Sequence, residues 1–431
     1  GNAVVVNGNS SFTSSDGIAT AAGDRITLSG LVSGTVLAIG GEGTVILAGT
    51  ENTFNNIAVK DSATVEFSHL DNIPAGTDFF LGGGTLKPVT EMILTEKFIL
   101  SGQSGGTIYN DHKLTLQGEV VKVAGENDTG TLKKQGTGLL CLDLTTTDAS
   151  LNYTGGLSIE QGEVVIKNGQ GISLGNLILA ANTTFTLQGN DITRSTTTTL
   201  TGTATINIDT DKTLTLNGAL NGVGSLIKEG TGTLILGSTN NYATNSNTGT
   251  YLNSGILGIA AENALGEKDI ILAGGELRGM ITTSLPNNML MTADTTFTAD
   301  ENTVLTLIGT ISGNQDVTKY GLGTVIMDSS DFEGDITVKE GTFTFNGSGS
   351  NDVLVEGGRF NGDGSVGVIT VRGGIVAGNG TYTRLILDGG TVASGNSIGR
   401  INIVGDYEQR AASVYEVEID RTNSDQVVAT G

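Results

Sequence analysis

A Gly-x-Gly pair followed by a short apolar run occurs four times in this chain of 431 residues, and no other sequence feature constrains the fold as strongly. The copies are GEGTVIL (41–47), GTGLLCL (136–142), GTGTLIL (230–236) and GLGTVIM (321–327), at spacings of 95, 94 and 91 residues. Similar blocks also recur between the copies, so each unit holds four or five strand-and-turn segments of roughly 20 residues. We expect these units near 41–135, 136–229, 230–320 and 321–363.

Short alternating runs such as TLTL (213–216) predict strands, and the many Val, Ile and Thr residues suit a pleated surface. The 66 glycines suit tight corners, because glycine adopts a positive φ angle without strain. Segments of roughly 20 residues cannot bury an apolar face alone, but they form a continuous core when each stacks on the next. The predicted fold class is therefore all-β: a right-handed parallel β-helix, which is a single-stranded solenoid of roughly twenty coils.

An array of separate β-sandwiches is the alternative fold, because sandwich repeats of about 92 residues are common. Three pairs of adjacent glycines favour the solenoid, since they stand 16 residues apart in VEGGRF (355–360), VRGGIV (371–376) and LDGGTV (387–392). We interpret these segments as three consecutive, shorter coils. With strands about 4.8 Å apart, twenty coils form a rod on the order of 100 Å long, which we expect to bind along its side.

The charge of the chain argues against two classes of partner. It carries a formal net charge of −23 and no cluster of Lys or Arg, so nucleic acid is not an expected partner, because phosphates must be neutralised by basic side chains. An anionic membrane surface would also repel it. No apolar run reaches 18 residues, so we expect no transmembrane helix. The first ten residues lack the features of a signal peptide, and we expect a mature chain or a fragment.

Two histidines and one cysteine offer little scope for metal or nucleophilic chemistry. His69 and His112 are expected in surface loops, and together with a single Cys they do not supply the ligands of a zinc site. Cys141 stands where the other three Gly-x-Gly copies have Ile, which indicates an inert, packed thiol. We therefore expect no metal and no cofactor.

The carboxylates leave a glycan-processing enzyme open as an alternative, because such enzymes also use parallel coils and carboxylate pairs. Asp61, Asp331 and Asp335 are examples, but no cluster among the 45 Asp and Glu residues repeats the spacing that a glycosidase site requires. No GDSG motif of a serine protease occurs, and we interpret NGDGS (361–365) as a corner turn rather than a calcium site. We predict that the chain is not an enzyme and has no catalytic residue.

Two regions could form a binding surface. The tract STTTTLTGTATINIDTDKTLTL (195–216) predicts alternating strands whose Thr hydroxyls face solvent, or else a hydrogen-bonding ladder that meets a glycan or another copy of the chain. The segment NNYATNSNTGTYLN (240–253) predicts a protruding loop. Tyr242 and Tyr251 are its candidate contact aromatics, because aromatic side chains often dominate binding surfaces.

Three of the Gly-x-Gly copies resemble a known family. They are preceded by Lys, in KQGTGLLCL…NYTGGLSIEQGEVVI (134–166), KEGTGTLIL (228–236) and KYGLGTVIM…DFEGDITVKEGTFTF (319–345), where Glu-Gly-Asp replaces the Thr-Gly-Gly turn. In the copy at 41, Ile39 occupies the place of the Lys. The pattern is similar to the passenger-associated transport repeat of bacterial autotransporters, the type V secretion proteins.

Residues 364–431 resemble the C-terminal end of such passengers. The matching parts are GNSIGRINIVGDYEQ (395–409) and YEVEID…SDQVVATG (415–431), with Ser394 where the family usually has Pro. The resemblance implies that 364–431 forms C-terminal β-helix coils with an autochaperone role, and that 1–363 forms the passenger stem. It also implies that the full-length protein is attached to an outer-membrane β-barrel, which these 431 residues do not include.

Together these features predict a non-enzymatic autotransporter passenger that is displayed on, or released from, a Gram-negative outer membrane. Its expected role is that of an adhesin or a self-association stalk, with a host surface glycan or protein, or another copy of itself, as partner. The mechanism would be multivalent polar contact along a rigid rod. A glycan-processing enzyme and a structural spacer that carries an N-terminal effector remain the alternatives.

Overall fold

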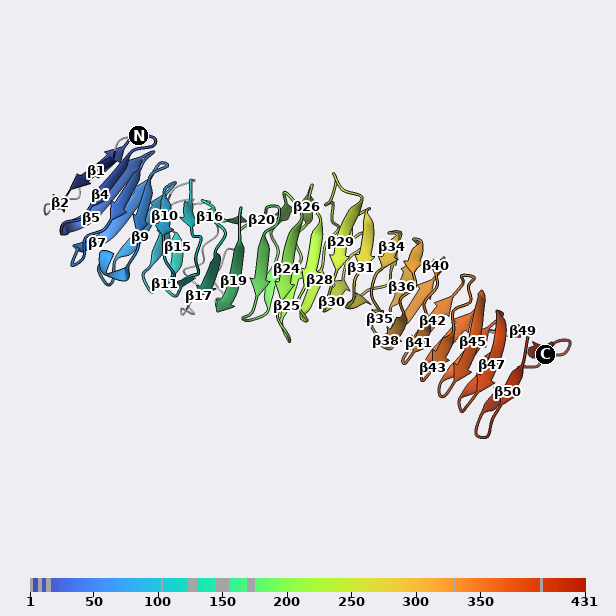
Figure 1. Cartoon of the computed structure of the whole chain (residues 1–431). Helices are drawn as coiled ribbons and strands as arrows, with labels where there is room; N and C mark the ends of the chain where they lie inside the picture. The colour runs from blue at the N-terminus through green and yellow to red at the C-terminus, as the bar shows by residue number, and fades with distance from the viewer. Residues whose placement is uncertain are drawn as a thin grey trace. The chain divides into compact units, whose positions relative to one another are not determined.

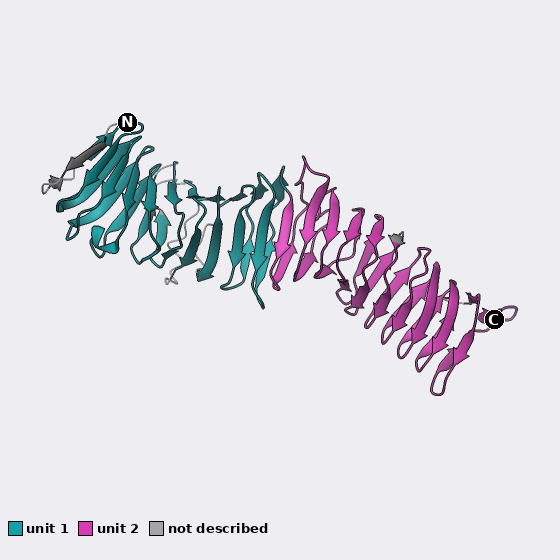
Figure 2. Cartoon of the chain, in the orientation of Figure 1, with its two compact units in different colours: residues 1–224 teal, residues 225–431 magenta. Residues whose placement is uncertain are grey.

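The computed structural model describes residues 3–6, 10–12, 17–101, 104–122, 130–144, 155–168, 175–328, 330–395 and 398–431. These residues form a β-solenoid of about 18 turns, in which strands of successive turns pair in parallel (Figure 1). The predicted fold class, an all-β parallel β-helix, is confirmed. The chain divides into two compact units, residues 1–224 and 225–431, which are described separately (Figure 2). In the part of the chain that is described, no helix is long and apolar enough to span a membrane.

Unit 1 contains four rows of parallel strands, here named A to D. Row A comprises β1 (Ala3–Val6), β4 (Arg25–Leu28), β6 (Thr44–Leu47), β8 (Thr64–Phe67), β10 (Thr85–Pro88), β13 (Gly106–Tyr109), β16 (Leu132–Gln135), β18 (Leu157–Ile159), β20 (Leu177–Leu179), β23 (Thr198–Leu200) and β26 (Leu220–Gly222). Row B comprises β2 (Ser10–Phe12), β5 (Val32–Gly41), β7 (Thr53–Lys60), β9 (Asp78–Gly82), β12 (Phe98–Leu100) and β15 (Val120–Lys122), and β3 (Gly17–Thr20) also pairs with β5. Row C comprises β11 (Met92–Leu94), β14 (Leu114–Leu116), β17 (Leu139–Asp143), β19 (Glu163–Asn168), β21 (Thr184–Leu187) and β24 (Ala204–Ile208). Row D comprises β22 (Ile192–Arg194) and β25 (Thr213–Leu216). A short 3₁₀ turn, η1 (Leu70–Asn72), follows β8 and belongs to none of the rows.

Unit 2 contains three such rows, E to G. Row E comprises β27 (Leu226–Glu229), β29 (Thr248–Leu252), β31 (Asp269–Leu272), β34 (Met289–Met291), β37 (Ile311–Gly313) and β40 (Ser330–Phe332). Row F comprises β28 (Thr233–Leu236), β30 (Ile256–Ile259), β32 (Glu276–Gly279), β35 (Thr295–Ala299), β38 (Val317–Tyr320), β41 (Ile336–Val338), β43 (Val353–Val355), β45 (Ser365–Val371), β47 (Thr381–Leu387), β49 (Arg400–Ile403) and β52 (Gln426–Ala429), and β50 (Tyr407–Gln409) also pairs with β47. Row G comprises β33 (Thr283–Leu285), β36 (Val304–Leu307), β39 (Thr324–Met327), β42 (Thr342–Phe345), β44 (Arg359–Gly362), β46 (Ile375–Gly378), β48 (Thr391–Ser394) and β51 (Val414–Glu416).

The Gly-x-Gly pairs form the corners between rows, which explains their recurrence. The first glycine of every copy has a positive φ angle: +90° at Gly41, +78° at Gly136, +72° at Gly230 and +77° at Gly321. The second glycine packs against the turn before it. A Cβ atom at Gly138 would lie 2.2 Å from the carbonyl oxygen of His112, and one at Gly323 would lie 2.1 Å from that of Asp300. An added Cβ atom would also lie 2.1 Å from a neighbouring atom at Gly41, 2.4 Å at Gly136 and 2.6 Å at Gly321, so these first glycines cannot be replaced without a shift of the backbone or its neighbours.

The core consists of inward columns in which each side chain lies on its register partner in the next turn. In row F, Leu277 pairs with Phe297, and Val338 pairs with Val355, and all four side chains are 0% exposed. Burial of each such side chain contributes about 1.5–3 kcal/mol. In unit 1, Phe79 of β9 stacks on Phe98 of β12 with ring centroids 5.0 Å apart. Alternating strand sequences thus supply a narrow aliphatic and aromatic core.

The three Gly-Gly segments near the C-terminus form consecutive turns, as predicted. Val355, Val371 and Leu387 are register partners in row F, and the second glycine of each pair has a φ angle between +64° and +71°. The predicted division of the chain at 363/364 falls between β44 and β45, inside this run of turns. Because the pairing of rows F and G continues across that point, the structure does not test the division, and it stays a prediction.

Candidate binding surfaces and lysine-capped corners

Three of the four Gly-x-Gly corners contain a fully buried lysine. Lys228 of β27 points inward, is 0% exposed, and lies two residues before the first glycine of its corner. Its Nζ donates hydrogen bonds to the carbonyl oxygens of Glu229 (2.6 Å), Gly230 (2.8 Å) and Ser254 (3.1 Å). Glu229 and Gly230 belong to the corner itself, whereas Ser254 belongs to the corresponding corner of the next turn. The ammonium group therefore caps one corner and ties it to its successor.

The other two lysines repeat this arrangement. Both are 0% exposed, and each donates to the carbonyls of the next two residues and to one carbonyl of the following turn. The acceptors of Lys134 Nζ are Gln135 (2.9 Å), Gly136 (2.7 Å) and Gln161 (3.3 Å). The acceptors of Lys319 Nζ are Tyr320 (2.7 Å), Gly321 (2.6 Å) and Glu340 (3.1 Å). In all three corners, the three N–H donors of an ammonium group match three carbonyl oxygens.

Burial lowers the pKa of Lys134, Lys228 and Lys319 to about 8, while a nearby carboxylate opposes this change in each case. The three carbonyl oxygens also favour the charged form, because they accept hydrogen bonds from the ammonium group. A lysine with a lowered pKa is often a catalytic group. Here each Nζ is enclosed by backbone and has no access to a substrate, so we assign these lysines a structural role.

The fourth corner satisfies the same backbone groups without a lysine. Ile39, which stands at the lysine position, is 1% exposed and apolar. The Thr20 hydroxyl donates to the carbonyl of Gly40 (3.3 Å), and the N–H of Ser62 donates to the carbonyl of Gly41 (3.0 Å). The Thr20 Oγ1 also accepts a hydrogen bond from the N–H of Gly43 (2.8 Å). A hydroxyl and an amide thus replace the ammonium group.

The structure corrects one of the two predicted contact aromatics. Tyr242 is 2% exposed, and its hydroxyl lies 2.5 Å from Thr250 Oγ1, so it belongs to the core and is not an exposed contact residue. Burial raises its pKa well above the ordinary value. Part of the predicted loop 240–253 is also β29. Tyr251 lies in β29 and is half-buried between its register partners Ile227 and Ile271, and its role in binding stays a prediction.

The two histidines and the cysteine considered for chemistry lie on different turns of unit 1. His69 and His112 are exposed, as expected. Cys141 is 7% exposed, and burial raises the pKa of its thiol, in agreement with a packed side chain. The Asp61 carboxylate accepts a hydrogen bond from the N–H of Gly41 at 3.3 Å. Within the described ranges, no three His, Cys, Asp or Glu side chains are arranged to hold a metal ion.

Asp335 belongs to a ladder of aspartates on successive turns of unit 2. Each carboxylate accepts a hydrogen bond from a backbone N–H of the following turn: Asp294 from Asp316 (2.9 Å), Asp316 from Asp335 (2.9 Å), Asp335 from Asp352 (3.0 Å) and Asp352 from Val368 (2.8 Å). The ladder thus fastens one turn to the next. The side chain of Asp331, the third carboxylate considered, lies outside the described residues.

Thr hydroxyls form outward columns, but the predicted tract is only partly of this kind. In row A, Thr44, Thr64, Thr85 and Thr107 are register partners on four consecutive turns. In the tract 195–216, Thr199 faces outward and is half-buried, whereas Thr198 points inward and is 0% exposed. The structure does not decide whether these columns bind a partner or only face solvent.

An open groove of about 800 Å³ lies beside the Lys319 corner in unit 2. Tyr320 and Leu322 form one side of it and are 43% and 64% exposed. Four carboxylates and one guanidinium also line it: Glu276, Asp300, Glu301, Glu340 and Arg278. Only Asp300 and Arg278 pair with each other, at 2.7 Å. Sequence reasoning missed this groove, because its residues come from four different turns.

A ladder of alternating charge runs from this groove toward the C-terminus on the outer face of row F. Its members occupy the same position on successive turns, since each backbone N–H bonds to the turn before: Lys339, Glu356, Arg372, Asp388 and Arg410. Lys339 lies 5.6 Å from the centre of the Tyr320 ring and 3.9 Å from Glu356. Alternating charges on neighbouring strands stabilise a sheet face.

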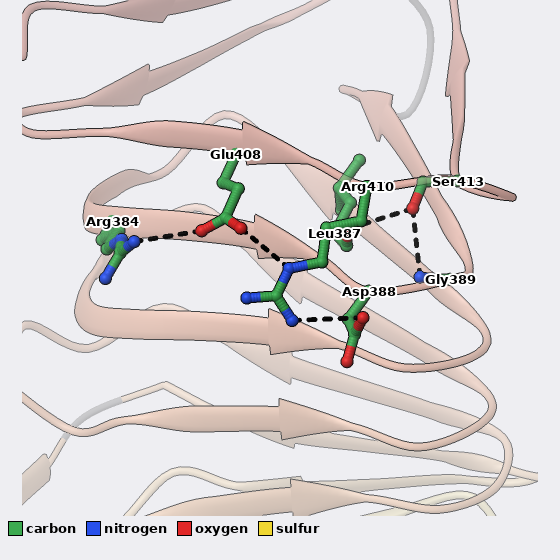
Figure 3. A network of polar contacts seen from close by, with 7 residues as sticks. All are labelled: Arg384, Leu387, Asp388, Gly389, Glu408, Arg410 and Ser413. Atoms are coloured by element: carbon green, nitrogen blue, oxygen red, sulfur yellow. Dashed lines mark hydrogen bonds and ion pairs between the residues drawn. The ribbon is translucent and has the colours of Figure 1, made fainter.

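The ladder ends in a network of ion pairs within the predicted autochaperone segment (Figure 3). Arg410 bridges Glu408 (2.7 Å) and Asp388 (3.2 Å), and Arg384 binds the other oxygen of Glu408 (3.1 Å). In the same view, the Ser413 hydroxyl donates to the carbonyl of Leu387 and accepts from the N–H of Gly389. The network fastens the connection between β50 and β51 to the turn before it.

Asp425 connects the two parts of the C-terminal sequence motif. Its carboxylate is buried and accepts hydrogen bonds from the N–H groups of Gly399 (2.8 Å) and Glu418 (2.9 Å), while the Tyr415 hydroxyl donates to its carbonyl (3.3 Å). Gly399 lies in the 395–409 part of the motif, and Glu418 and Tyr415 lie in the 415–431 part. The geometry therefore explains why Asp is required there, whereas the autochaperone role stays a prediction.

Comparison with known proteins gives one partial relative. No protein-family model and no solved structure matches the chain. A stretch of 154 residues, 34% of this chain, is 31% identical to the protein named Adhesin BmaC autotransporter from Brucella suis biovar 1 (strain 1330). The match spans only 4% of that protein's length. Over about a third of its length, this solenoid is thus similar to part of an autotransporter adhesin.

Proposed function

We propose that this chain is part of an autotransporter passenger, displayed on or released from a Gram-negative outer membrane, and that it acts as an adhesin or a self-association stalk. The observation that carries the proposal is the similarity to part of an autotransporter adhesin, in a chain that folds as a parallel β-solenoid. The Lys-x-Gly-x-Gly corners and the C-terminal motif agree with it, because both are features by which the sequence resembles such passengers.

The mechanism is repetition of weak contacts. Consecutive turns of unit 1 present an outward column of half-buried Thr side chains, and consecutive turns of unit 2 present a ladder of charged side chains at nearly the same position. A single exposed polar contact contributes little, in the range of about 0–1 kcal/mol for an ion pair. Many such contacts on one rigid surface bind strongly together, because the later ones form within a single complex. Binding in this form requires no catalytic residue.

Binding to cells tests the proposal. The purified chain, labelled with a fluorophore, is incubated with cultured epithelial cells, and its self-association is measured in parallel by sedimentation velocity over a range of concentrations. Saturable cell binding or reversible oligomers support an adhesin or a stalk. A chain that stays monomeric and binds no cells is a spacer. Release of sugars from a panel of cell-surface glycans would instead establish the glycan-processing alternative.

A further inference from the structure

We propose that the groove beside Tyr320 in unit 2 binds a basic peptide segment of a partner protein, one that carries several Lys or Arg side chains. The inference rests on the proposed function and names the chemistry of one contact site. The groove spans four successive turns of row F and has a volume of about 800 Å³, which lies within the usual range of ligand sites. It is open along its length, so it suits an extended segment.

The charged side chains that line the groove favour a positively charged ligand. Arg278 is compensated by Asp300, and Lys339, just outside, lies next to Glu356. Among the residues that the structure describes, Glu276, Glu301 and Glu340 form no ion pair. Glu340 also interacts electrostatically with the buried Lys319. Three carboxylates without an ion pair at one site attract Lys or Arg side chains and repel phosphate, sulfate and sialic acid. An anionic glycan is therefore the wrong class of ligand for this groove.

The remaining lining supplies the apolar part of the contact. Tyr320 and Leu322 are exposed next to each other at the corner, although large apolar side chains are usually covered. The Lys319 ammonium group holds the carbonyl of Tyr320, so the backbone that carries this pair is fixed. Aromatic and aliphatic groups beside carboxylates bind the methylene chains of Lys and Arg as well as their charges.

The floor of the groove contains a polar group that lacks a partner. Thr298 lies on the turn before Tyr320, is 7% exposed, and its hydroxyl forms no hydrogen bond within the described part of the chain. A buried hydroxyl without a partner is costly in a folded protein and calls for an explanation. The hydroxyl oxygen itself is covered, so a polar group of a peptide in the groove would bond to it only after the lining side chains move apart.

The test is peptide binding to the full chain, followed by fluorescence anisotropy. The probe is a short labelled peptide with four lysines and one leucine on a Gly/Ser backbone, and the comparison probes are its glutamate counterpart and a neutral hexasaccharide. We expect the lysine peptide to bind and the other two to fail. Substitution of Glu276, Glu301 and Glu340 by Gln should weaken binding about tenfold, and Tyr320→Ala should weaken it as well.

A matched control separates this site from general attraction to an acidic protein. Glu51, Glu262 and Glu267 are exposed, lie outside the groove, and give the same change of charge when all three are replaced by Gln. This control should change the affinity by no more than about twofold. Equal losses in both triple variants would overturn the proposal, and so would binding of the hexasaccharide in place of the peptide.

Cell binding by the same variants distinguishes the two proposals. If the wild-type chain binds cells and the groove variant binds equally well, the groove proposal fails and the adhesin proposal stands. If the chain binds the lysine peptide through the groove but binds no cells, the adhesin proposal fails and the groove stands. Loss of cell binding in the groove variant alone, with unchanged thermal unfolding, supports both.

Discussion

The Lys228 corner and the Ile39 corner supply hydrogen-bond donors to their backbone carbonyls in different ways. Both have a Gly-x-Gly turn with a positive φ angle at the first glycine. At Lys228 a single ammonium group bonds to three carbonyls on two turns, whereas at Ile39 a Thr hydroxyl and a backbone N–H bond to the two carbonyls of the corner itself, those of Gly40 and Gly41. The comparison teaches that the glycines define the corner. Its carbonyl oxygens can receive hydrogen bonds either from a lysine or from a hydroxyl and an amide.

The largest expected effect is the loss of a lysine. Lys134→Met removes the ammonium donor of three buried or part-buried carbonyls, of which that of Gln135 keeps the N–H of Asn110 as a donor. We expect the substitution to reduce the free energy of unfolding by about 3 kcal/mol. Ile39→Met is the matched control in the same unit, and we expect a loss below about 1.5 kcal/mol, because it exchanges one buried apolar side chain for another. Urea denaturation followed by circular dichroism measures both. Equal losses in the two variants would show that the lysine only fills space.

The second prediction concerns the part that both corners share. Gly43→Ala and Gly138→Ala would each place a Cβ atom within 2.6 Å of a carbonyl oxygen of the preceding turn. We expect each to destabilise the fold by about 2 kcal/mol, with or without a lysine in the corner. Gly76 is the control, since its φ angle is +81° but nothing lies within 4 Å of an added Cβ. Gly76→Ala should cost only about 1 kcal/mol, from the backbone angle alone. A corner glycine that tolerates Ala as well as Gly76 does would contradict the close packing.

The third prediction transfers the lysine to the corner that lacks it. Thr20→Ala removes the donor to Gly40, and it also removes the acceptor for Gly43 N–H, so it should cost about 1 kcal/mol. In the background of Ile39→Lys the same substitution should cost less, because the new ammonium group supplies the donor to Gly40. A double-mutant cycle measures this difference, with an expected coupling of at least about 0.5 kcal/mol. If the effects of the two substitutions are simply additive, the Thr20 hydroxyl and the ammonium group introduced by Ile39→Lys do not act on the same carbonyl.

The last prediction concerns pH. The pKa of Lys134 falls from 10.5 to about 8 on burial, so between these pH values the unfolded chain keeps a proton that the folded chain has released. The unfolded state then binds more protons, and raising the pH stabilises the folded state. The difference in unfolding free energy between the wild type and Lys134→Met should therefore grow between about pH 8 and 10.5. A difference that stays constant over this range would contradict the lowered pKa.

The corners could be predicted from the sequence, but the role of the lysine could not. Glycine is required locally, and its spacing is visible in the chain. The carbonyl that each lysine reaches in the next turn lies 27, 26 or 21 residues away, for Lys134, Lys228 and Lys319 respectively. Because this spacing varies, the sequence alone does not indicate the contact. A lysine in an alternating strand is expected to face solvent, unless the acceptors that compensate its burial are known.

The surface was harder to predict than the core. Tyr242 was expected to be exposed because Asn and Thr surround it in the sequence, but its hydroxyl finds Thr250 eight residues later and the ring is buried. The groove beside Tyr320 depends on which residues of four turns share a face, and turns of unequal length hide that relation in the sequence. The C-terminal motif was recognised by resemblance, whereas the contacts of Asp425 required the structure.

Hydrogen exchange across the Lys134 corner tests most directly the claim that the buried lysines join successive turns. The informative amides are Gly138, in the corner itself, and Glu160, in the next turn, whose N–H bonds to the carbonyl of Lys134. In Lys134→Met both should exchange faster than in the wild type. In Ile39→Met the amide of Gly43, which corresponds to Gly138, and the amide of Ser62 in the next turn should keep their protection. Faster exchange at Gly138 with unchanged protection at Glu160, or no change at either, would contradict a lysine that bridges two turns.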